Sequence, residues 1–61
     1  MMEAMESVHQ NLVESVIELE MASKTLFTGG HKKEAKDLAI VAKNLKSKRD
    51  KLQKQLQNQN E

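Results

Sequence analysis

The chain has 61 residues, which is enough for one small domain. Ten Lys or Arg residues face nine Asp or Glu residues, so the net charge is only +1. The sequence contains no cysteine, which excludes disulfides and thiolate metal sites. Its one aromatic residue, Phe27, makes base stacking on single-stranded nucleic acid a poor explanation. Chains this short bury little surface, so we expect packing against another chain to add stability.

The composition predicts an all-α fold. Proline is absent, and Ala, Leu, Glu, Lys, Gln and Met, which all favour helices, dominate the chain. No apolar run approaches the roughly 20 residues that span a bilayer. The first ten residues carry acids where a signal peptide carries basic residues. We therefore expect a soluble, cytoplasmic protein with no membrane partner.

A first helix is predicted over residues 2–27, because its apolar residues recur at alternating spacings of three and four. This pattern is typical of a coiled-coil-like seam. The seam residues are Met5, Leu12, Val16, Leu19 and Leu26. His9 and Ser23 fill the two remaining seam positions. We interpret His9 as a seam residue, because no second histidine or cysteine lies near enough in sequence to complete a metal site.

A turn is predicted at residues 28–31, where Gly29 and Gly30 interrupt the helical pattern. Glycine adopts the left-handed conformation that ends many helices, and we assign that role to Gly29. His31 then caps the next helix, with Glu34 at its third position. A connection this short predicts antiparallel neighbours. The alternative is one continuous helix, in which the two glycines would cost about 2 kcal/mol.

A second helix is predicted over about residues 32–57, followed by a frayed polar tail at 58–61. Its seam again alternates by three and four, and the small alanines allow a close helix–helix approach. The seam residues are Ala35, Leu38, Ala42, Leu45, Leu52 and Leu56. Arg49 takes the remaining seam position. We interpret it as a register device that reaches toward an acid, rather than as a catalytic group.

The charges of the two halves favour folding one on the other. Residues 1–28 hold five glutamates and one lysine, a net charge of −4, whereas residues 31–61 hold nine basic and four acidic residues, a net of +5. Exposed ion pairs stabilise by only about 0–1 kcal/mol each, so the asymmetry selects the pairing. Pairing residues whose numbers sum to about 61 places seam against seam, with Val16 opposite Leu45.

Several large apolar residues lie off both seams. They are Val13, Ile17, Met21, Ile40 and Val41. In the predicted register they fall near mid-height, and we expect them to form an apolar surface that contacts a partner. The partner is a second copy, giving a homodimeric four-helix bundle, or another helical protein. The sequence thus predicts a small non-enzymatic interaction or oligomerisation module of the regulatory or adaptor kind.

The alternative function is a basic-faced hairpin dimer that binds nucleic acid as a regulator. Lysines of the second half supply the basic face: Lys32, Lys36, Lys43, Lys46 and Lys54. We rank this function second, because Arg49 is the only arginine present for reading base edges. No serine has a base at a spacing typical of a nucleophile, so we expect no catalytic residues, and no cofactor or metal.

Overall fold

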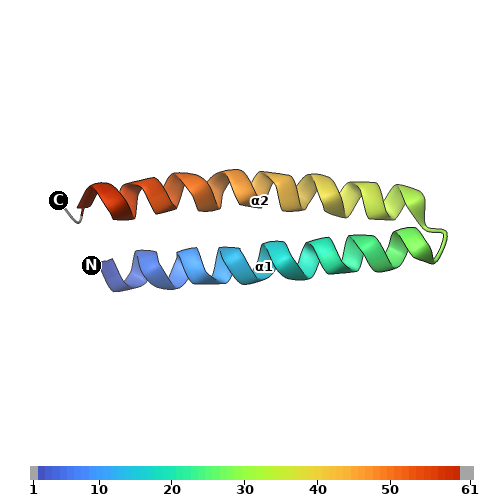
Figure 1. Ribbon diagram of the computed structural model, residues 1–61, viewed down its shortest axis with the longest axis horizontal. Coiled ribbons are helices and arrows are strands. Elements are labelled where there is room, and N and C mark those ends of the chain that lie inside the picture. The colour runs from blue at the N-terminus through green and yellow to red at the C-terminus, as the bar shows by residue number, and fades with distance from the viewer. Residues whose placement is uncertain (1, 60–61) are drawn as a thin grey trace.

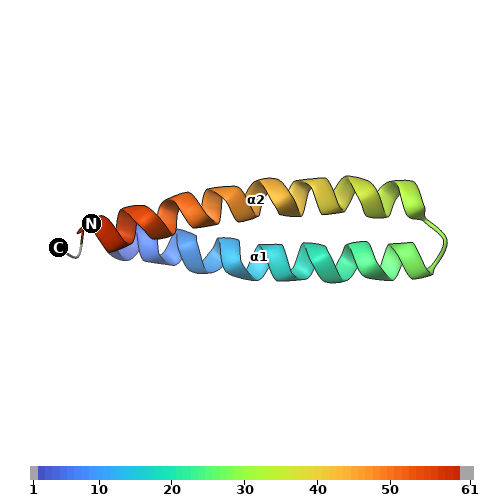
Figure 2. The same ribbon diagram turned by 45° about the horizontal axis from the view of Figure 1, so that its top comes forward.

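The computed structural model describes residues 2–59, which form two long helices side by side (Figure 1). Helix α1 spans Met2–Thr28 and helix α2 spans Lys32–Gln59. They run antiparallel over a length of 48 Å, with both chain ends at one end and the turn at the other (Figures 1 and 2). The predicted all-α hairpin is confirmed, and the continuous helix is excluded. Helix α2 continues through Asn58 and Gln59, which the sequence pattern assigned to the frayed tail, and residues 60 and 61 of that tail lie outside the described residues.

The turn is a Schellman motif centred on Gly30. The amide of His31 donates to the carbonyl of Leu26 at 2.9 Å, and the amide of Gly30 donates to that of Phe27 at 3.2 Å. Gly30 has a φ of +91°, whereas Gly29 is not in the left-handed region. The assignment of Gly29 as the left-handed residue was therefore wrong by one position. Two adjacent glycines are equally able to adopt this conformation, and the hydrogen-bond pattern selects the second.

Helix α2 begins directly after the turn. The carbonyl of His31 accepts the first helical hydrogen bond from the amide of Ala35 at 3.0 Å, so His31 is the N-cap residue. Its own amide is already bonded to Leu26, which leaves Glu34 without the amide that a capping box requires. Lys32 places its Nζ 5.8 Å from the ring centre of Phe27. This contact adds a side-chain link between the two helices beside the turn.

The core is one thin layer along the seam. Its fully buried residues in the described chain are Val16, Ala35 and Ala42, with exposed fractions of 1%, 3% and 2%. The other residues assigned to the seam, including His9, Ser23 and Arg49, are half-buried. Two of the three buried residues are alanines, so the helices approach closely where they meet. A core this small leaves much apolar side-chain surface in water.

Two side-chain contacts join the helices across the seam. Ser23 donates from its Oγ to the carbonyl oxygen of Ala35 at 2.6 Å. Lys46 Nζ lies 2.6 Å from Glu20 Oε2. Helical side chains lean toward the N-terminus of their own helix, so in an antiparallel pair Glu20 and Lys46 lean toward each other. The residue numbers sum to 58 for the Ser23–Ala35 contact and to 66 for the Glu20–Lys46 pair, on either side of the predicted sum of about 61.

We predict that Gly30→Ala lowers the free energy of unfolding by about 1–2 kcal/mol, the cost of the left-handed conformation for a residue with a Cβ. Gly29→Ala is the matched control, because its added Cβ would lie 3.4 Å from the nearest atom, the carbonyl oxygen of Thr25. We expect that control to leave stability unchanged or raise it by about 0.4–1 kcal/mol. Thermal unfolding followed by circular dichroism measures both. Equal losses would contradict the assignment of Gly30.

The close helix approach predicts a second stability effect. Ala42→Leu adds three carbon atoms at a position that is 2% exposed, so it should lower the free energy of unfolding by about 1–3 kcal/mol. Ala22→Leu makes the same change at an exposed position of α1 and should stay within about 0.5 kcal/mol. Chemical denaturation of both variants checks the difference. Tolerance of leucine at position 42 would mean that the helices lie further apart.

Candidate functional site

The hairpin exposes two broad faces, one on each side of the seam. Glu20 follows buried Val16 by four positions, and Lys46 follows buried Ala42 by four positions. Because Glu20 and Lys46 pair with each other, the residues at these two positions of the helical repeat lie on one face of the hairpin. We call it the groove face. Its inner rows repeat every seven residues: Glu6, Val13, Glu20 and Phe27 on α1, with Lys32, Ala39, Lys46 and Gln53 on α2. The opposite side is called the reverse face and carries Val8, Val41 and Lys48.

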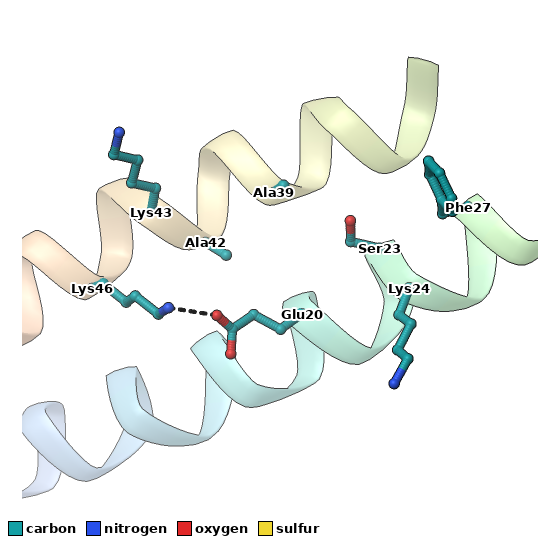
Figure 3. Close-up of a pocket in the computed structure, with 8 residues that line it drawn as sticks. All are labelled: Glu20, Ser23, Lys24, Phe27, Ala39, Ala42, Lys43 and Lys46. Carbon is teal, nitrogen blue, oxygen red and sulfur yellow. Dashed lines mark ion pairs between the residues drawn. The ribbon is translucent and has the colours of Figure 1, made fainter. Parts of the chain in front are cut away.

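A groove runs between the helices on the groove face, in the half of the hairpin near the turn (Figure 3). It is open and has a volume of about 700 Å³. Ser23, Ala39 and Ala42 lie between the two helices, and the Phe27 ring stands at the end toward the turn. The groove exists because these positions carry small side chains, which leave the space between the helices unfilled. A second hollow adjoins it and adds Ala35 to the lining.

The rim of these hollows is strongly basic. Five lysines line them: Lys24, Lys32, Lys36, Lys43 and Lys46. Lys46 is paired with Glu20, the only acid of the lining, and Lys32 lies over Phe27. Within residues 2–59, no carboxylate comes within ion-pair distance of Lys24, Lys36 or Lys43. Figure 3 shows Lys24 and Lys43 extending away from the groove into solvent. A groove with an apolar floor and such a rim suits an acidic amphipathic partner.

The apolar residues predicted to contact a partner are largely exposed. Ile17 and Ile40 are each 52% exposed, Met21 is 65% exposed and Val41 is 44% exposed, whereas Val13 is half-buried. Helical periodicity places Val13 and Ile17 toward the groove face. Val41 directly precedes buried Ala42 and so lies on the reverse face. Met21 and Ile40 lie on the outer sides of α1 and α2.

Met21, Ile40 and Val41 therefore lie near one height along the hairpin, with Ile17 and Val13 one and two turns nearer the chain ends, and helical periodicity distributes the five over different sides. The register determines which residues of α1 and α2 lie at the same height. Their position within the seven-residue repeat determines on which side of the hairpin they lie. Two other exposed apolar residues, Val8 and Phe27, are 50% and 56% exposed. The spacing of seven residues between Val13, Glu20 and Phe27 was the sequence signal that would have placed Phe27 at the groove.

A polar level interrupts the seam near the chain ends. The side chain of Arg49 is 27% exposed, and its Nε and Nη2 both donate to Oδ1 of Asp50 at 3.1 Å. Arg49 thus bonds to its neighbour on α2 rather than to an acid of α1. The Nε2 atom of His9 is buried and has no hydrogen-bond partner among the described residues. Both groups are costly to hold inside an apolar seam.

We predict that Arg49→Leu raises the midpoint of thermal unfolding, because an apolar side chain completes the seam and removes a half-buried charge. Lys54→Leu, at an exposed position of α2, controls for a general effect of added hydrophobicity and should change the midpoint little. Differential scanning calorimetry gives both midpoints. A clear fall for Arg49→Leu would show that the guanidinium makes a stabilising contact that outweighs its desolvation.

The described residues hold no candidate metal centre and no candidate membrane span. No group of three His, Asp or Glu side chains there is placed to hold a metal ion. Neither α1 nor α2 combines the length and the apolar character that crossing a membrane requires. Comparison of the chain with protein-family models, curated proteins and solved structures finds no match. The groove and the exposed apolar residues are therefore the candidate functional surfaces of the described chain.

Proposed function

We propose that this chain is a non-enzymatic interaction module that associates with itself, two hairpins packing into a four-helix bundle. One observation carries the proposal: among the described residues only three are buried, and large apolar side chains are exposed on several sides, Ile17 and Met21 among them. Exposed apolar surface of this extent on a small chain usually marks a protein contact. In a bundle each helix has two neighbours, so it buries a wider apolar stripe than a hairpin alone can cover.

The energy of self-association comes from the apolar residues that the hairpin leaves exposed. Covering one large apolar side chain, aliphatic or aromatic, stabilises by roughly 1.5–3 kcal/mol. Two such residues per copy, for example Ile17 and Phe27, offset a substantial part of the cost of bringing two chains together. Another helical protein with an apolar stripe would satisfy the same surface. A second copy is favoured as the partner, because each copy has a small core and exposes the same apolar residues.

Nucleic acid is the second candidate, favoured by the five lysines that line the groove. Against it, Arg49 is hydrogen-bonded to Asp50 and so is not free to read base edges. The dependence of binding on salt concentration distinguishes the two candidate functions. Binding of a duplex oligonucleotide through several phosphate contacts weakens by orders of magnitude between about 50 and 200 mM salt. Apolar docking of two hairpins is much less sensitive to salt.

We predict that Ile17→Glu raises the dissociation constant of the homodimer at least about a hundredfold, because it removes an apolar contact and places a charge in the interface. Sedimentation equilibrium of the full chain at several concentrations measures the constant. Circular dichroism reports how much helix each species retains, since a chain this small is expected to lose some helicity when it dissociates.

Ser7→Glu is the matched control, because it adds the same charge to the outer, exposed side of α1. We expect it to leave the dissociation constant within about threefold of the wild type, as for a surface substitution outside the interface. Unchanged association of the Ile17→Glu protein would place the contact surface elsewhere on the hairpin. A wild-type chain that remains monomeric at millimolar concentration would refute self-association itself.

A further inference from the structure

We propose that, in the dimer, the basic groove of one hairpin receives the acidic end of the same face of the second copy, with the two turns at opposite ends. This inference rests on the proposed self-association and specifies its surface and orientation. It is carried by the distribution of charge along the groove face, together with the groove and the position of the apolar residues. The occupant is thus the groove face of a second copy of this chain.

The groove face is divided into two halves of opposite charge. Near the turn it carries Lys24, Lys32, Lys36 and Lys43, all of which line the hollows. Near the chain ends the same rows and the rows beside them carry Glu3 and Glu6, together with Asp50, whose carboxylate is paired with Arg49. The Glu20–Lys46 ion pair lies between the halves and is neutral as a unit. A copy turned end for end therefore sets each basic half against an acidic half.

The apolar residues of this face fit the same arrangement. Val13 and Ile17 lie near the middle of the hairpin, where a two-fold axis relating two antiparallel copies would pass. Such an axis brings these residues of one copy against the same residues of the other, as an isologous interface requires. Phe27 then covers the acidic end of the partner's α1. Apolar contact at the centre and ion pairs toward both ends is the usual division within a protein interface.

Two other arrangements use the same residues differently. With the turns at the same end, lysines would face lysines, which is unfavourable for close charges. The reverse face has the opposite order of charge, with Glu18, Glu34 and Asp37 in the turn half and Lys48 and Lys51 in the other. Groove face on reverse face would therefore attract with the turns at the same end. That contact is heterologous and need not close, so it would build chains rather than dimers.

The test exchanges the charges of the two halves. One variant carries Lys24→Glu with Lys36→Glu, and the other carries Glu3→Lys with Glu6→Lys. Each places like charges opposite each other in its own homodimer, and we expect each dissociation constant to rise at least about tenfold. An equimolar mixture should form a heterodimer within about threefold of wild-type affinity, because both of its charge contacts are again complementary. Sedimentation equilibrium and native mass spectrometry measure these species.

The control carries Lys48→Glu with Lys51→Glu, the same charge change on the reverse face, and should keep wild-type affinity. Recovery in the mixture also shows that the single variants still fold. If the wild type dimerises and only the reverse-face control disrupts it, the groove is not the interface, although self-association stands. Failure of the mixture to recover would overturn the end-for-end orientation. The wild type could instead form assemblies larger than dimers that disappear in both the groove-face and the reverse-face variants. That result would overturn the end-for-end orientation and indicate open chains.

Discussion

The fold depends on the close approach of α1 and α2 at a few small seam residues. Ser23 reaches the backbone of Ala35 directly, and a 2.6 Å hydrogen bond to a carbonyl is available only when the helix axes lie close together. That contact fixes how the helices are aligned, and the alignment brings Glu20 to Lys46. The same small residues also create the groove, because Ala39 and Ala42 do not fill the space beside the seam. One choice of side-chain size therefore sets both the packing and the candidate site.

Helix extents and seam positions were predictable from sequence because both depend on periodicity along one chain. The choice between Gly29 and Gly30 was not, since it depends on which carbonyls the turn amides reach. The prediction of one apolar surface considered only height along the hairpin: Met21 and Ile40 are level, but helical periodicity places them on the outer sides of different helices. The groove was also missed, because it is defined by the absence of side-chain volume between two helices. Its signal in the sequence is the run of small residues near the turn, next to lysines at helical spacing.

Charge acts at two levels in this molecule. Between the helices, the acidic first half and basic second half favour the hairpin over pairing of like helices. Along each face, the lysines and acids gather in opposite halves, and in the proposed dimer this separation would orient the second copy. Exposed pairs contribute only about 0–1 kcal/mol each, so they choose orientation. In the proposed dimer, contacts between apolar side chains would supply most of the free energy of association.

The distribution of buried residues links the proposed dimer to stability. Ala35 and Ala42 are buried in the half near the turn, where the Schellman motif and the Phe27–Lys32 contact also lie. Toward the chain ends the seam residues are half-buried, and His9 and Arg49 occupy two of its positions. The proposed end-for-end dimer would set the well-packed half of each copy against the less well-packed half of the other. Each hairpin would then supply its partner with apolar cover where the partner's own seam is weakest, so association and folding would strengthen together.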